Sequence, residues 1–184
     1  MSLTESKMIP LGTKAPDFKL KDTVSGKEMS LSDIPSENAR VIMFICNHCP
    51  YVLHITEEIA KLAKDYKKKG VGFLAISSND VENYPVDSPE NMKAFAKDEK
   101  FNFPYLYDET QEVAKAYDAA CTPDFYIFDK KDKLAYRGRL DDSRPNSGIP
   151  VTGAELRAAL DTVLNREKVS ATQYPSMGCN IKWK

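Results

Sequence analysis

The stretch that decides the fold is Val41-Ile42-Met43-Phe44-Ile45, followed at once by Cys46-Asn47-His48-Cys49 and Pro50. A continuous apolar, partly β-branched run of this kind is typical of a strand that is covered on both faces. Beyond Pro50 the apolar residues recur with helical spacing as far as residue 69, at Val52, Ile55, Ile59, Leu62, Ala63 and Tyr66. The C-x-x-C segment is therefore predicted to join a strand end to a helix start.

Strands and helices alternate on both sides of this junction. Two extended pieces, residues 12–20 and 26–31, flank a Ser25-Gly26 turn and predict a hairpin. A second buried strand, a helix, a short helix, a β-hairpin and a last helix follow at residues 71–77, 88–96, 109–117, 125–137 and 152–164. This order predicts an α/β fold with a mixed central sheet, helices on both faces and one domain over residues 1–184, with its core at about 10–165 and an irregular tail at 166–184.

The charge balance excludes several classes of partner. The 184 residues contain 26 Lys and Arg against 27 Asp and Glu, a net charge of −1, so no broad basic surface is expected. We therefore expect neither nucleic acid nor an anionic membrane as a partner. Residues 1–16 lack a basic stretch followed by an apolar core, and the apolar run 41–46 is too short to span a bilayer. These features predict a cytoplasmic protein.

Four cysteines are too few for a disulfide scaffold in a chain of this length, so the C-x-x-C indicates redox chemistry or metal binding. A thiol at a helix start is stabilised as thiolate by the partial positive charge there. Cys46 is accordingly predicted to be the nucleophile and Cys49 the residue that resolves a mixed disulfide on Cys46. His48, if protonated, would favour the Cys46 thiolate; the alternative is a solvated loop side chain.

A zinc half-site is the structural alternative for the cysteine pair. It needs two further ligands, and the sequence offers only Cys121, Cys179, His48 and His54, with no second C-x-x-C. The sequence therefore predicts no metal and no other cofactor.

With these residues in place, the chain resembles the thioredoxin-like superfamily, in its redoxin or AhpC-TSA (peroxiredoxin-like) branch. Residues 12–20, with the pattern G-x-x-A-P-D-F-x-L, are similar to the opening signature of that branch. The resemblance covers about residues 10–165 and implies a three-layer α/β/α fold with an N-terminal β-hairpin. It also implies that Thr122-Pro123 is the cis-proline loop, which lies beside the C-x-x-C and offers backbone groups to a bound peptide. The alternative is an ordinary trans proline.

The same resemblance bears on the choice of activity. Peroxiredoxins carry a threonine three residues before the peroxidatic cysteine and a proline after it; Cys49-Pro50 fits the second feature, whereas Cys46 stands in the threonine position. Cys121-Thr122-Pro123 stands where those enzymes tend to carry an arginine. Both departures favour disulfide exchange over peroxidase activity. Residues 41–45 also lack the acidic proton shuttle of thioredoxin, which leaves water or His48 as proton acceptor.

Two further cysteines lie outside the pair. The resemblance would bring Cys121 close to it as an accessory thiol, and Cys179 belongs to a tail that could fold back over the core. Each could equally be a small buried apolar residue, and a Cys121–Cys179 disulfide depends on geometry that sequence does not reveal. The charged residues Arg139, Asp141, Asp142 and Arg144 either line a substrate entrance or form a solvated loop.

The sequence thus predicts a thiol-disulfide oxidoreductase that exchanges a Cys46/Cys49 dithiol and disulfide with a protein or small-thiol substrate, at the expense of an external thiol reductant. A thiol peroxidase using the same residues is the first alternative. A thioredoxin-like binding module without turnover is the second.

Overall fold

The computed structural model describes residues 3–184 and is built on a seven-stranded mixed sheet. Strand β4 (Ala39–Phe44) lies inside this sheet and is buried along its whole length, as the apolar run predicts. It pairs in parallel with β5 (Val71–Ser77) and antiparallel with β8 (Asp124–Asp129). The strand order is β3-β2-β6-β5-β4-β8-β9, with β6 at Tyr105–Tyr107 and β9 at Leu134–Gly138.

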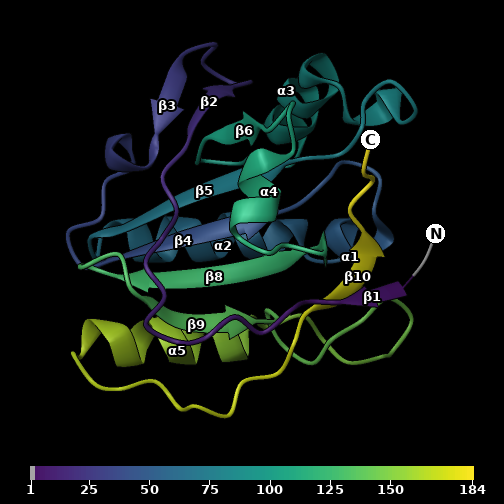
Figure 1. Cartoon of the computed structure of the whole chain (residues 1–184). Helices are drawn as coiled ribbons and strands as arrows, with labels where there is room; N and C mark the ends of the chain where they lie inside the picture. Colours follow the sequence, from purple (N-terminus) through teal and green to yellow (C-terminus); the bar gives the residue numbers. More distant parts are fainter. Residues whose placement is uncertain (1–2) are drawn as a thin grey trace.

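Helices cover both faces of this sheet. On one face, α2 (Thr56–Lys67), α3 (Pro89–Asp98) and α5 (Ala154–Leu164) pack against alternate residues of β4 and β5. On the other face, α4 (Glu112–Ala116) and the N-terminal segment pack against the intervening residues of β4 and β5. Figure 1 shows α4 in front of the sheet and α2 behind it. The fold is the expected three-layer, thioredoxin-like α/β/α arrangement.

The predicted N-terminal hairpin is confirmed, with shorter strands. It consists of β2 (Lys19–Asp22) and β3 (Glu28–Ser30), which pair antiparallel around the Ser25-Gly26 turn. Gly26 takes a φ of +77°, which a side chain would disfavour. Two 3-10 turns, Leu31–Asp33 and Pro85–Asp87, complete the short elements.

The helix predicted from Pro50 to residue 69 is broken into α1 (Pro50–Leu53) and α2. Ile55, between the two, has φ −119° and ψ 2°, outside the helical range. The Thr56 hydroxyl donates to the Leu53 carbonyl at 3.4 Å, which competes with the backbone pattern of a continuous helix. The apolar spacing survives the break, so sequence periodicity alone does not reveal it.

The prediction of an irregular tail is wrong for its last residues. Met177–Asn180 form strand β10, the middle strand of a second sheet between β1 (Leu3–Glu5) and β7 (Cys121–Thr122). At the right of Figure 1, β1 and β10 lie beside α1, next to the end of β4 that carries the C-x-x-C. The two partners of β10 are far from it in sequence, which is why the tail offers no local signal of a strand.

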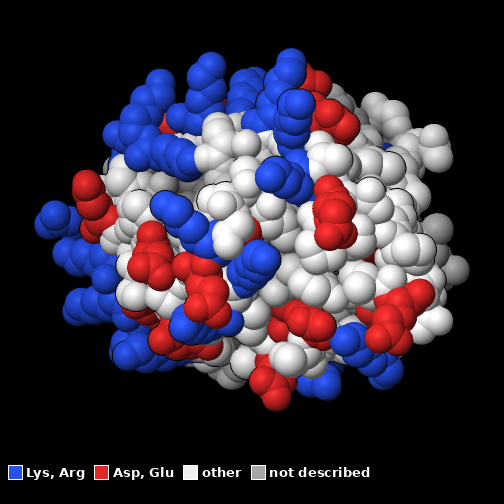
Figure 2. Space-filling view, turned by 90° about the horizontal axis from the view of Figure 1, so that it is seen from above, with Lys and Arg blue, Asp and Glu red and all other residues white. Residues whose placement is uncertain are grey.

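Within residues 3–184, no helix combines the length and the apolar character needed to cross a membrane. On the face shown in Figure 2, basic side chains gather along the upper and left edges, and acidic and basic side chains alternate over the lower part.

Because β4 is buried on both faces, neighbouring residues of β4 should both be costly to truncate. Ile42 packs on the α4 side and Met43 on the α2 side, with exposed fractions of 0% and 1%. We expect Ile42→Ala and Met43→Ala each to lower the free energy of unfolding in urea by about 2–5 kcal/mol. Leu53→Ala, at an exposed position, serves as the control. A loss below about 0.5 kcal/mol for either core variant would contradict two-sided burial.

Candidate active site

The C-x-x-C segment is held between the end of β4 and the start of α1. The Ile45 N–H donates to the Ile76 carbonyl at 3.0 Å, which extends the strand to the residue before Cys46. Cys49 is the N-cap of α1, and its carbonyl accepts from the N–H groups of Val52 and Leu53 at 2.9 and 3.0 Å. The helix therefore begins at Pro50, as the apolar spacing predicts, with Cys49 as its N-cap.

Three sulfur atoms and Thr122 meet at this junction. Cys46 Sγ lies 3.4 Å from Thr122 Oγ1, and Cys49 Sγ lies 3.2 Å from the Thr122 carbonyl oxygen. Cys49 Sγ also shares a hydrogen bond of 2.8 Å with Cys179 Sγ. The Thr122–Pro123 peptide bond is cis, as predicted. Cys46, Cys49 and Cys179 are 1%, 0% and 5% exposed, so the whole cluster is covered in this state.

The surroundings of Cys49 favour its thiolate. The hydrogen bond with Cys46 is the main cause, and Cys179 and the Val52 N–H add to it; together they outweigh burial and lower the pKa of Cys49 to about 5. The Thr122 carbonyl oxygen opposes this by accepting from protonated Cys49. A helix start that supplies an N–H to a cysteine is a known way to stabilise a thiolate.

The surroundings of Cys46, in contrast, favour its protonated thiol. The hydrogen bond with Cys49 keeps the shared proton on Cys46, and burial and the negative charge of Asp87 further raise the pKa of Cys46, against the Thr122 hydroxyl. These pKa directions differ from the sequence-based expectation that Cys46 is the thiolate, and the roles of the two cysteines stay a prediction. Cys49, as the N-cap of α1, has the hydrogen bond from the Val52 N–H that favours a thiolate.

His48 places a ring nitrogen within 4.8 Å of both Cys46 Sγ and an Asp87 carboxylate oxygen, and its effect on Cys46 stays a prediction. Its Nδ1 lies 2.8 Å from an Asp87 carboxylate oxygen, and its ring stacks on Tyr84 with centroids 5.8 Å apart. Asp87 is fully buried and also accepts from the Asn47 N–H and the Asn79 side chain, each at 2.8 Å. The nearest partner of His48 is therefore an acid that disfavours the Cys46 thiolate.

Cys121 lies beside the cluster but faces away from it. In the second sheet Cys179 is directly opposite Thr122, so Cys121, one residue earlier, points to the other side of the pleat. Cys121 Sγ contacts the Pro123 carbonyl oxygen at 3.8 Å, and burial, with the nearby Asp124 carboxylate, raises its pKa. The structure pairs Cys179 with Cys49, not with Cys121.

One group of side chains offers candidate ligand atoms for a metal ion. Among residues 3–184, the potential ligand atoms of Cys46, His48 and Asp87 lie within 4.8 Å of one another. The carboxylate of Asp87, however, lies 2.8 Å from His48 Nδ1 and already accepts hydrogen bonds from Asn47 and Asn79. A metal would have to break these contacts.

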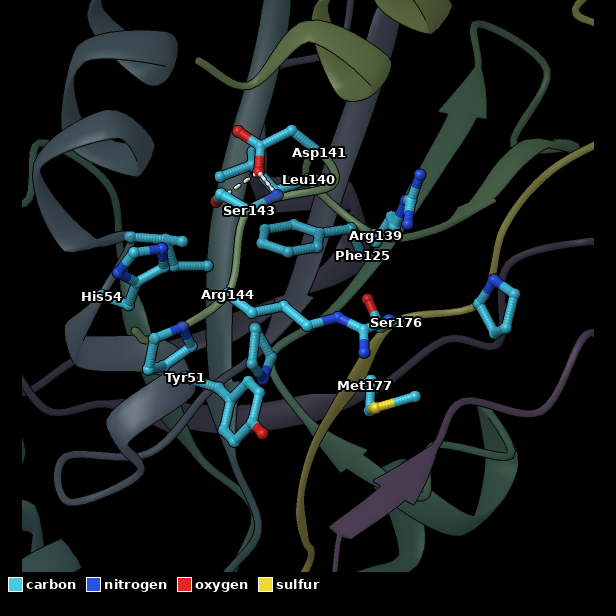
Figure 3. A pocket seen from close by; sticks show the side chains of 14 residues that line it. Tyr51, His54, Phe125, Arg139, Leu140, Asp141, Ser143, Arg144, Ser176 and Met177 are labelled. Carbon is cyan, nitrogen blue, oxygen red and sulfur yellow. Dashed lines mark hydrogen bonds between the residues drawn. The ribbon is translucent and has the colours of Figure 1, made fainter. Parts of the chain in front are cut away.

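A pocket opens beside Pro123, bounded by α1, the loop after β9 and the residues before β10 (Figure 3). Arg139, Asp141 and Arg144 line it, whereas Asp142 does not. Asp141 accepts two backbone N–H groups just before α5, each at 2.7 Å, and Arg139 forms an ion pair with that helix. Only Arg144 extends across the opening, where a bound molecule could meet it.

The sequence analysis missed three charged residues of the site region. Asp87 holds the C-x-x-C loop, and Asp124 and Arg137 form a fully buried ion pair of 3.5 Å beneath the cis-proline loop. Burial raises the pKa of Asp124 to about 7. An acid inside an apolar strand, directly after Pro123, was the one available signal; nothing in the sequence singles out Asp87.

Comparisons with known proteins agree with this chemistry. Residues 11–137 match the AhpC/TSA family. A crystal structure of an uncharacterized conserved protein from Geobacillus kaustophilus is 61% identical with a TM-score of 0.98, over 100% of this chain and 97% of that one. The thiol-disulfide oxidoreductase ResA of Geobacillus thermodenitrificans is 28% identical over 71% of this chain and 70% of its own length. The 1-Cys peroxiredoxin B of Oryza sativa is 27% identical over 83% and 63%, respectively.

The assignment of the thiolate can be tested by pH titration of the reduced protein. A lowered pKa means that the proton leaves at lower pH, so the ultraviolet absorbance of a thiolate should rise with a midpoint near pH 5, well below the usual value of about 8.5. Cys49→Ser should abolish this step, and Cys121→Ser should leave it in place. Persistence of the step in Cys49→Ser would show that another thiol carries it.

The influence of Asp87 can be measured on Cys46 alone, in a Cys49→Ser background. Replacing Asp87 by Asn keeps an acceptor for the Asn47 N–H but removes the negative charge. We expect the pKa of Cys46 to fall by about 1 in the Asp87→Asn variant, read from the same absorbance. An unchanged or higher pKa would mean that the charge of Asp87 does not act on Cys46.

Proposed function

Since the chain belongs to the AhpC/TSA family of thiol redox proteins, we propose that it is a thiol-disulfide oxidoreductase in which Cys46 and Cys49 alternate between dithiol and disulfide. The observation that supports this most strongly is the hydrogen-bonded contact of Cys46 and Cys49 beside a cis-proline loop, with the pKa of one cysteine raised and that of the other lowered. Such a pair is ready to supply both a nucleophile and a resolving thiol.

In the proposed cycle Cys49 attacks first. Its thiolate displaces one sulfur of a substrate disulfide, which leaves as a thiolate while the other sulfur becomes bonded to Cys49. Cys46 then gives up its proton and attacks Cys49 Sγ, which releases the second substrate sulfur and forms the Cys46–Cys49 bond. The substrate is reduced by two electrons and the pair is oxidised. This order reverses the roles predicted from the sequence, because Cys49 rather than Cys46 has the lowered pKa.

The proposed substrate is a protein disulfide or a small disulfide, and an external thiol would return the pair to the dithiol. We propose a cytoplasmic location, where thiol reductants are abundant. Since both sulfur atoms are covered, a protein substrate would have to displace part of the covering chain, whereas a small disulfide needs less opening.

Peroxide reduction is the second candidate, and one observation favours it. Cys49, with a lowered pKa, directly precedes Pro50 at the start of α1, as a peroxidatic cysteine does. Its thiolate would attack one peroxide oxygen to give a sulfenic acid and hydroxide; condensation with the Cys46 thiol would then release water and form the disulfide. The position of Cys46 beside Thr122 serves either reaction equally.

Trapping of the mixed disulfide distinguishes the order of attack. Two double variants, Cys46→Ser/Cys179→Ser and Cys49→Ser/Cys179→Ser, each leave one cysteine of the pair and remove the sulfur that touches Cys49. With a small disulfide at pH 7, we expect an adduct to form on Cys49 about 10-fold faster than on Cys46, because the Val52 N–H still favours the Cys49 thiolate whereas the charge of Asp87 disfavours the Cys46 thiolate. The larger thiolate fraction of Cys49 outweighs its lower intrinsic nucleophilicity. Mass spectrometry measures both rates. Faster modification of Cys46 would restore the roles predicted from the sequence.

Turnover of the wild type provides the second test. Disulfide reduction and peroxide consumption are followed side by side with a dithiol as reductant, with Cys46→Ser and Cys49→Ser as variants and Cys121→Ser as a matched control. We expect disulfide reduction that falls at least about 100-fold in both active-site variants. Peroxide consumption alone would favour the second candidate, and the absence of both activities would exclude an enzyme of either kind.

A further inference from the structure

The C-terminal strand places a third cysteine directly on the active-site pair. Strand β10 runs antiparallel to β7, with Cys179 opposite Thr122, the residue that contacts both Cys46 and Cys49. Its sulfur lies 2.8 Å from Cys49 Sγ. Gly178 makes this close approach feasible, because a Cβ at that position would lie 2.0 Å from the Thr122 carbonyl oxygen. An extended segment bearing a cysteine thus lies along the cis-proline loop.

The position of Cys179 is fixed by chain on both sides of it. Before β10, the Ser176 hydroxyl donates to the Gly138 carbonyl at 2.8 Å. After it, the Ile181 N–H donates to the Ala120 carbonyl at 3.0 Å, and the Lys182 carbonyl accepts from the Asp80 N–H at 2.8 Å. These anchors come from three separate parts of the fold, so the contact between Cys179 and Cys49 is built into the structure.

We propose that Cys179 is a third redox-active cysteine, which exchanges with the Cys46–Cys49 disulfide to form a Cys49–Cys179 disulfide. The proposal rests on the proposed function, which supplies the oxidised pair. Cys179 loses its proton and attacks Cys49 Sγ, so that the Cys49–Cys179 bond forms as the Cys46–Cys49 bond breaks. Cys46 leaves as a thiolate and takes up the proton. One disulfide replaces another, and no external oxidant or reductant is consumed.

Proximity favours this intramolecular step over attack by a thiol from solution. Well-oriented groups in one molecule react as if at effective concentrations of about 10⁵ M or more, far above those of cellular thiols. Burial and the hydrogen bond to Cys49 raise the pKa of Cys179 to about 12 in the reduced protein. Oxidation of the pair removes the negative charge of Cys49, and the nearby Lys182 ammonium acts in the same direction, so both ease ionisation of Cys179 at the moment when it is needed.

The exchange has a structural consequence for the oxidised protein. The Cys49–Cys179 bond would tie β10 covalently to the N-cap of α1, while Cys46 would return to the thiol form beside Thr122. The oxidising equivalent would then be stored under the C-terminal strand, and Cys46 would be free to attack Cys49 again and reverse the transfer. The proposed cycle therefore has two oxidised states instead of one.

Peptide mapping tests the proposal without relying on turnover. Trypsin is expected to leave Cys46 and Cys49 together in peptide 41–61, Cys179 in 169–182 and Cys121 in 116–130. The Cys46→Ser variant is oxidised with glutathione disulfide, quenched in acid and digested. We expect peptide 41–61 to be linked to 169–182, because Cys179 displaces glutathione from Cys49. The Cys179→Ser/Cys46→Ser variant should retain the glutathione adduct, and Cys121→Ser/Cys46→Ser should behave like Cys46→Ser.

The same peptide mapping has an outcome that would overturn the proposal. A stable glutathione adduct on Cys49 in the Cys46→Ser variant, with Cys179 still reactive to an alkylating reagent after unfolding, would overturn the proposal. In oxidised wild type the linked peptide should also be found, and a product closed only within 41–61 would likewise count against it. Because the mapping reads a bond and not an activity, loss of catalysis with the linked peptide present would reject the proposed function alone.

A second variant tests the role of the strand. Gly178→Ala keeps all four cysteines but pushes β10 away from Thr122. We expect the fraction of peptide 41–61 that is linked to 169–182 to fall at least about 10-fold, because the exchange depends on close orientation of the two sulfur atoms. Peptide 41–61 with an internal Cys46–Cys49 disulfide should remain. Undiminished linkage would show that docking of β10 on β7 is not what brings Cys179 to Cys49. Circular dichroism confirms that each variant is folded.

Discussion

The site depends on one interaction, the contact of Cys49 Sγ with a second sulfur on each side. Cys46 supplies a hydrogen bond from within the C-x-x-C, and Cys179 supplies another from the far end of the chain at 2.8 Å. These donors, with the Val52 N–H of the first helical turn, give a buried cysteine a low pKa, although burial alone would raise it. A thiolate in contact with two other sulfur atoms can form and exchange disulfide bonds without large movements.

The fold serves this contact by bringing three separate segments to one end of the central sheet. Burial on both faces fixes the position of β4, and Cys46 lies just beyond the end of this strand. The start of α1 delivers Cys49, and the β7–β10 pairing delivers both Thr122 and Cys179. Asp87 holds the loop through the Asn47 N–H and, through its charge, keeps the proton on Cys46. The difference between the two cysteines of one motif thus follows first from the hydrogen bond between them, and then from Cys179 and Asp87, which are remote in sequence.

This separation explains what could be predicted from the sequence. Strand β4, the hairpin and the alternating helices follow from local patterns. The cis bond of Thr122-Pro123 was predicted from the family resemblance. The protonation of the two cysteines could not be predicted, because it depends on the hydrogen bonds among Cys46, Cys49 and Cys179 and on the charge of Asp87. The break at Ile55 could not be predicted either, because the apolar spacing runs unbroken across it. Strand β10 pairs only with distant partners, and Asp87 acts through a charge contact that leaves no pattern. Local signals therefore reveal the framework, while the protonation of the pair depends on hydrogen bonds and charges that leave no pattern in the sequence.

The most direct test of this account is a carbon NMR titration of the reduced wild-type protein, labelled at the cysteine Cβ atoms and assigned with single Cys→Ser variants. It reports each cysteine separately in the intact cluster. The account predicts that the Cys49 signal shifts with a midpoint near pH 5, while Cys46 and Cys179 keep their protons to well above pH 8. A Cys46 signal that titrates before that of Cys49 would contradict it.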